Sequence, residues 1–111
     1  MLTEVRWQKE QELMQSVFPQ FKAFTQESCF GFEGRLKGQR SGRFYHVVLE
    51  GRQASYPQCA PSVRMTPSVG PYWIGEGERQ KLCVIREWQP ARSTFANTLL
   101  VVVKFLDEND G

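Results

Sequence analysis

The chain has 111 residues, enough for a single hydrophobic core, so we expect residues 1–111 to form one domain. Hydrophobic residues make up 41% and aromatic residues 13%, which excludes a disordered chain, and no apolar run approaches the length of a membrane span. The formal net charge of +2 argues against a phosphate-gripping surface, so we expect neither a nucleic acid nor a membrane as partner.

The first predicted element is a helix over residues 3–18. Thr3 can cap it, strong helix formers fill it and Pro19 ends it. A wholly polar stretch at 8–12 suits a helix that lies on the surface of a sheet. The apolar residues of this helix are Val5, Leu13, Met14, Val17 and Phe18.

Strand candidates follow the helix and are joined by short connections. Apolar residues at even spacing, such as Phe30 and Phe32, are typical of a half-buried strand. Successive strands with short connections favour an antiparallel four-stranded meander. The candidate strands cover residues 21–28, 29–38, 43–50 and 62–67.

Residues 68–80 hold three glycines and one proline, and we expect them to be irregular. The apolar run at 99–103 is β-branched enough for a strand, but the spacing over 94–106 is helical, and Ser93 or Thr94 can cap a helix there. We therefore predict a helix over 94–106. The predicted order is an N-terminal helix, four strands, an irregular segment and a C-terminal helix, which makes an α+β domain.

The three cysteines are odd in number and widely spaced. No Cys-x-x-Cys pair is present and His46 is the one histidine, so we expect no zinc site and no cofactor. The stretch MLTEVRWQKEQELMQS lacks the apolar segment of a secretory signal, so we expect reduced thiols and a cytoplasmic location.

Cys83 lies in KLCVIREWQP at 81–90, and its neighbours support two readings. Leu82, Val84 and Ile85 suit a buried thiol, because a free cysteine usually behaves as a small hydrophobic residue. Lys81 and Arg86 (and Arg79 nearby) suit a reactive one, because nearby cations favour the nucleophilic thiolate. The local sequence leaves both readings open.

Several motifs occur in a fixed order along the chain. Tyr-Pro at 56–57 follows the third strand, and a proline and a short apolar strand come next at 61–66. Leu82-Cys83 follows the irregular segment, and Trp-x-Pro at 88–90 leads into the last helix. In this order the motifs resemble those of the ubiquitin-conjugating enzyme family, and the similarity covers nearly the whole chain.

The resemblance implies a ubiquitin-conjugating-enzyme-like fold in which Cys83 carries an activated modifier as a thioester and passes it to a lysine. The compact length is similar to that of bacterial relatives in anti-phage operons. There, such a domain joins the C-terminal glycine of a cGAS-like nucleotidyltransferase to target lysines. The implied partner is that nucleotidyltransferase or another protein modifier. No Gly-Lys-Ser/Thr phosphate loop is present, so activation would come from a separate adenylating enzyme, or the donor would arrive activated.

This sequence departs from the family pattern at one catalytic element. The family's His-Pro-Asn, whose asparagine steadies the oxyanion, has no counterpart between the fourth strand and Cys83. Tyr72 or a backbone amide could supply that polarisation, and Arg86 and Trp88 would support the site. The alternative reading of Tyr72 and Trp88 is packing of the loop on the sheet.

Two other functions stay open on the sequence alone. The chain could be a non-catalytic variant of the same fold that binds a partner protein, or a redox-sensing thiol protein that uses Cys83 and Cys59. Cys59 lies between prolines in a loop that we expect to be exposed, and Cys29 reads as structural. Nothing in the sequence ties His46 to Cys83, so it reads as a sheet residue rather than a base.

Overall fold

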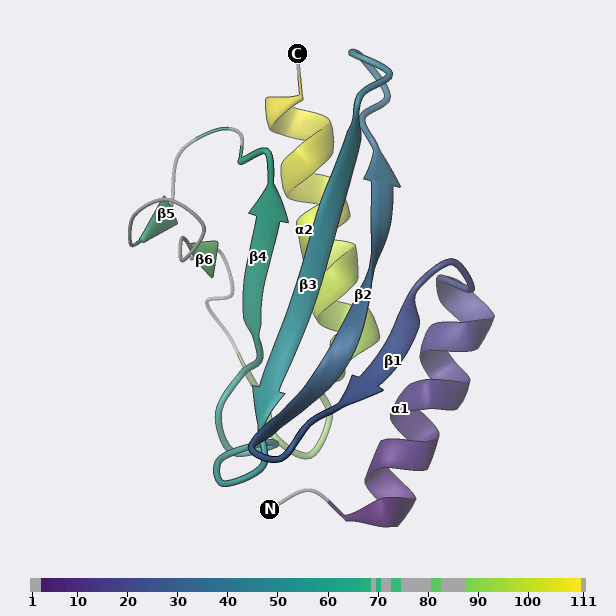
Figure 1. Ribbon diagram of the computed structural model, residues 1–111, viewed down its shortest axis with the longest axis vertical. Helices are drawn as coiled ribbons and strands as arrows, with labels where there is room; N and C mark the ends of the chain where they lie inside the picture. The colour runs from purple at the N-terminus through teal and green to yellow at the C-terminus, as the bar shows by residue number, and fades with distance from the viewer. Residues whose placement is uncertain (1–2, 69, 71–72, 75–80, 83–87, 111) are drawn as a thin grey trace.

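The computed structural model describes residues 3–68, 70, 73–74, 81–82 and 88–110. Its elements are α1 (Glu4–Val17), β1 (Lys22–Thr25), β2 (Cys29–Lys37), β3 (Phe44–Arg52), β4 (Ser62–Thr66), β5 (Trp73–Ile74), β6 (Lys81–Leu82) and α2 (Phe95–Asn109). Strands β1 to β4 form one antiparallel sheet in sequence order, and α2 lies behind it in Figure 1. The predicted α+β order and the four-stranded meander are thus confirmed.

The sheet buries one face and leaves the other to solvent, because side chains alternate along each strand. In β3, Tyr45, Val47 and Leu49 point into the core, whereas Phe44 and His46 point outward. The inward residues of β2 and β4 complete the sheet's share of the core: Phe30, Phe32, Leu36, Val63 and Met65.

Helix α1 begins after Thr3, whose side chain accepts a hydrogen bond from the Arg6 amide at 3.1 Å. Trp7 packs on the core, with its ring centroid 5.0 Å from that of Phe30. Within the polar stretch 8–12, Glu10 is buried, with 1% of its surface exposed. Three of the apolar residues of this helix are exposed: Val5, Leu13 and Val17.

Helix α2 supplies the other layer of the core, and the strand alternative for its apolar run is wrong. Its buried residues keep helical spacing, including Phe95, Leu99 and Val102. A reciprocal capping box between Thr94 and Asn97 starts the helix. Neither helix in the described part of the chain is long and apolar enough to cross a membrane.

The sequence predicts that residues 68–80 are irregular, but part of this segment forms a strand. Trp73 and Ile74 pair with Lys81 and Leu82 in a separate antiparallel ladder, β5–β6. Leu82 is buried and belongs to the core cluster, and β6 lies beside β4 in Figure 1. Burial of Leu82 anchors β6 to the core just before position 83.

Asp110 joins the end of α2 to the turn between β2 and β3. Its buried carboxylate accepts hydrogen bonds from the Arg40 amide at 2.9 Å, the Ser41 amide at 3.0 Å and the Tyr45 hydroxyl at 2.8 Å, and from the Ser41 hydroxyl. Gly38 makes room, because a Cβ there would lie 2.3 Å from this carboxylate. The bonds from Ser41 above all hold the pKa of Asp110 well below its usual range.

We expect Asp110→Asn to destabilise the protein at neutral pH and to flatten its acid unfolding. A carboxyl group whose folded pKa is depressed stabilises the fold above its unfolded pKa of about 3.9, and that stability is lost as pH falls toward the folded value. Urea unfolding at about pH 7 and about pH 3 measures both effects. Asp107→Asn, at an exposed position of α2, is the control and should change neither the stability at neutral pH nor its loss at acid pH. An equal change of stability with pH in Asp110→Asn and in the unsubstituted protein would contradict the prediction.

Candidate functional site

The candidate site is the segment around Cys83, and the structure describes its two flanks. Cys83, Tyr72 and Arg86 lie outside the described residues, so their predicted roles stay predictions. Leu82 precedes the segment and is buried, and Trp88 follows it and packs against the core cluster. The contacts that hold these two flanks therefore define the described part of the site.

Trp88 is fixed by the Tyr-Pro turn. Its indole Nε1 donates a hydrogen bond of 2.6 Å to the Pro57 carbonyl oxygen, and its ring centroid lies 5.7 Å from that of Tyr56. The Tyr56–Pro57 peptide bond is cis. The turn after β3 and the Trp-x-Pro element, 31 residues apart in sequence, are thus in direct contact.

Replacing Trp88 should separate the contribution of its hydrogen bond from that of its packing. We expect Trp88→Phe to lower the free energy of unfolding by about 1–2 kcal/mol, because the indole N–H and part of the ring are lost while one six-membered ring is retained. Trp88→Ala should cost about 2–3 kcal/mol, because the ring contacts go as well. Denaturant unfolding followed by circular dichroism measures both values. Equal losses in the two variants would contradict the prediction, because they would show that the ring that phenylalanine retains adds nothing to stability.

A buried carboxylate lies behind the Tyr-Pro turn. Glu10 on α1 accepts hydrogen bonds from the Tyr56 hydroxyl, from Arg6 Nε at 3.2 Å and from the Phe95 amide at 3.0 Å. Burial first, and then the hydrogen bond to Glu10, raise the pKa of Tyr56, so its phenol stays protonated and donates. One side chain therefore connects α1, the turn and the first residue of α2.

Arg6 extends this network to the residues that follow Trp88. Its guanidinium donates to the Pro90 carbonyl oxygen at 2.8 Å and to the Ser93 carbonyl oxygen, and its Cζ lies 5.4 Å from the Tyr56 ring centroid. Burial alone would lower the pKa of Arg6, but its interactions with Tyr56 and Glu10 outweigh that effect and raise it. The chain leaving the Cys83 segment is held by a permanently charged donor.

Sequence reasoning missed Glu10 and Arg6. The i, i+4 spacing of an acidic and a basic residue was visible and is typical of an ion pair on a helix surface. Burial of the pair depends on Tyr56 and Phe95, which lie 46 and 85 residues from Glu10. No local sequence pattern predicts these long-range contacts of Glu10.

The remaining candidate residues are Cys59, two residues after Pro57 in the turn that contacts Trp88, Cys29 and His46. Cys59 is exposed, as predicted, and Cys29 is half-buried with its Sγ 3.1 Å from Gln26 Oε1. His46 lies on the outer face of the sheet with its Nε2 3.5 Å from Glu33 Oε2. Among the described residues, no group of three His, Cys, Asp or Glu side chains could hold a metal ion.

Comparisons with known proteins do not identify a relative: no family model, no curated protein and no solved structure matches this chain. The features of the chain that bear on function are the order of the motifs and the contacts among the described ones. Those contacts place the Tyr-Pro turn and the Trp-x-Pro element together at one end of the sheet. Leu82 on one side and Trp88 on the other thus anchor the two ends of the segment that contains Cys83.

Proposed function

We propose that this protein is a cytoplasmic transferase of the ubiquitin-conjugating type. Cys83 carries the C-terminal glycine of a partner protein as a thioester and transfers it to a lysine. The partner is a ubiquitin-like modifier or a cGAS-like nucleotidyltransferase with a C-terminal glycine, and the role is anti-phage defence. A separate adenylating enzyme activates the glycine, or the donor arrives activated.

The observation that supports this proposal is the bond between Trp88 and Pro57. The two motifs that carry the resemblance on either side of the fourth strand meet in space, and the α+β order around them matches the expected arrangement. The flanks of Cys83 are anchored by core packing of Leu82 and by Trp88. Fixed flanks suit a nucleophile that must meet a partner's chain end in one geometry.

The chemistry requires two acyl transfers. In the first, the Cys83 thiolate attacks the activated glycine carbonyl, a sulfur–carbon bond forms, and the activating group leaves with its electron pair. In the second, a lysine amine attacks the thioester carbonyl, an amide forms, and the thiolate leaves as the amine loses a proton. Lys81 and Arg86 would favour the thiolate, and Tyr72 or a backbone amide would donate to the oxyanion in place of the absent asparagine.

The test is to mix the purified protein with the activated partner and to follow the products on denaturing gels with and without a thiol reductant. The unsubstituted protein should give a heavier band that reductant removes, because a thiolate is a good leaving group. Absence of any adduct, with the partner shown to be activated, would overturn the proposal and favour a protein-binding module of the same fold.

A further inference from the structure

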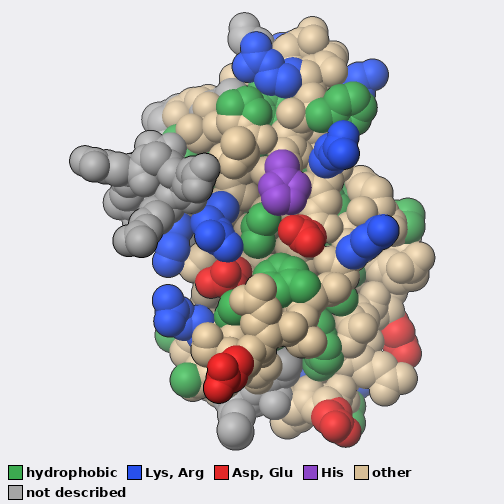
Figure 2. Space-filling model, viewed as in Figure 1, with side chains coloured by type: hydrophobic (Ala, Val, Ile, Leu, Met, Phe, Trp, Pro, Cys, Tyr) green, Lys and Arg blue, Asp and Glu red, His purple; other side chains and the backbone are tan. Residues whose placement is uncertain are grey.

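The outer face of the four-stranded sheet carries a hollow that the proposed transfer chemistry does not use. Both helices contact the inner face through the core, and Figure 2 shows the outer face with the one histidine near its centre. A hollow of about 760 Å³ opens on this face around the ends of β2 and β3. The hollow is open to solvent, and its lining comes mainly from β1, β2 and β3.

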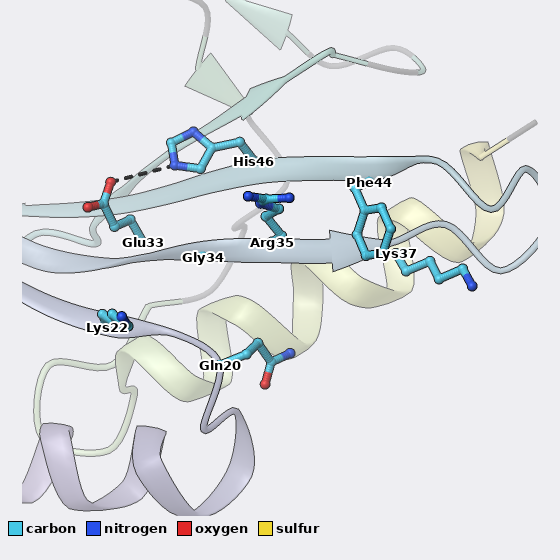
Figure 3. A pocket seen from close by; sticks show the side chains of 8 residues that line it. All are labelled: Gln20, Lys22, Glu33, Gly34, Arg35, Lys37, Phe44 and His46. Atoms are coloured by element: carbon cyan, nitrogen blue, oxygen red, sulfur yellow. Dashed lines mark ion pairs between the residues drawn. The ribbon is translucent and has the colours of Figure 1, made fainter.

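Three cations line the hollow. Lys22, Arg35 and Lys37 project onto the same face from β1 and β2, as Figure 3 shows. Arg35 and Lys37 are two residues apart on one strand, so their Cα atoms are about 7 Å apart. No ion pair in the described part of the chain engages any of the three. Such a group of like charges attracts an anion.

The one carboxylate in the lining, Glu33, is turned toward His46, as the dashed line in Figure 3 marks. Its Oε2 lies 3.5 Å from His46 Nε2. Cations therefore outnumber carboxylates here, although the whole chain has a net charge of only +2. The small net charge of the chain is thus compatible with a local excess of positive charge in this hollow. This hollow can therefore attract phosphate although the charge of the whole chain is close to balance.

Phe44 adds a feature that a simple anion would not need. Its side chain is 57% exposed on an open sheet face, and β-sheet pairing sets it opposite Lys37. The Lys37 Nζ lies 6.0 Å from the ring centroid. An exposed aromatic ring beside cations that form no ion pair among the described residues is a combination that binds a base by stacking and its phosphates by charge.

We propose that this hollow binds a nucleoside phosphate. The base stacks on Phe44, the phosphates pair with Arg35 and Lys37, and Glu33 and His46 face the sugar hydroxyls. The arrangement differs from a glycine-rich phosphate loop, because side chains of a sheet replace backbone amides. The proposal is independent of Cys83, which lies in another segment.

Calorimetric titration with three probes tests the proposal: ATP, adenosine and inorganic tripolyphosphate. ATP should bind at least about 10-fold more tightly than either fragment, because only ATP engages both the ring and the cations. Phe44→Ala should weaken ATP binding by about 5- to 100-fold, as expected for loss of one stacked base. Arg35→Ala should weaken ATP and tripolyphosphate alike. Lys104→Ala, an exposed cation on α2, is the matched control and should change neither.

Three outcomes would overturn the proposal. One is no ATP binding at millimolar concentration by protein with a native circular dichroism spectrum. Another is tripolyphosphate binding as tightly as ATP with no effect of Phe44→Ala, which leaves an anion site only. The third is single-stranded DNA of about ten nucleotides binding far more tightly than ATP, which would assign the face to nucleic acid.

Discussion

Cys83→Ala should form no reductant-sensitive adduct with the activated partner, and Cys83→Ser should form either none or an ester that reductant leaves intact. Alanine offers no nucleophile, and an oxyester, unlike a thioester, resists thiols. The loss in Cys83→Ala should be complete rather than partial, because no other group would carry the acyl chain. Gel electrophoresis with and without reductant, and the mass of the adduct, measure both outcomes.

Cys59→Ser is the matched control, since it removes the exposed thiol of the loop after β3. It should retain the full yield of adduct. A reductant-sensitive adduct that persists in Cys83→Ala would contradict the assignment. Loss in Cys59→Ser, with the protein still folded, would move the chemistry to Cys59 or to a pair of thiols, as a redox protein requires.

Glu10→Ala should lower the free energy of unfolding by about 3 kcal/mol. The substitution leaves the Tyr56 hydroxyl and the Phe95 amide buried without their acceptor, and it leaves Arg6 without its carboxylate. Removing one member of a buried, hydrogen-bonded charge pair costs much more than removing an exposed charge. Urea unfolding followed by circular dichroism gives the value.

Two further variants check the cause. Glu12→Ala removes a carboxylate from an exposed position of the same helix and should change the stability by less than about 0.5 kcal/mol. Glu10→Gln retains an acceptor oxygen, so its loss of unfolding free energy should fall between those of Glu10→Ala and Glu12→Ala. Equal stability of Glu10→Ala and Glu12→Ala would show that the buried carboxylate contributes nothing to the fold.

The regular elements were predictable because their signals are local. Thr3 and Pro19 bracket α1, and the structure has the helix over Glu4–Val17. Helical spacing correctly outweighed the β-branched run at 99–103, since the buried residues of α2 follow that spacing. The predicted strands 21–28 and 43–50 differ from β1 and β3 at their ends, where pairing decides how far a strand extends.

The tertiary features were not predictable from local patterns. The burial of Glu10 and of Asp110 depends on donors that lie far away in the sequence. His46 was read as a sheet residue, and its place on the open face follows from Tyr45 and Val47 taking the inner one. At the candidate site, the sequence showed the order of the Tyr-Pro turn and Trp88 along the chain, and the fold shows the hydrogen bond between them.

The hydrogen bonds from the β2–β3 turn to Asp110 have a consequence for amide exchange with solvent. The amides of Arg40 and Ser41 belong to exposed residues, which ordinarily exchange quickly, yet both are bonded to a buried carboxylate. These two amide hydrogens should therefore exchange more slowly than those of other surface turns. Their exchange should accelerate whenever the last turn of α2 frays, so the hairpin tip and the helix end form one opening unit.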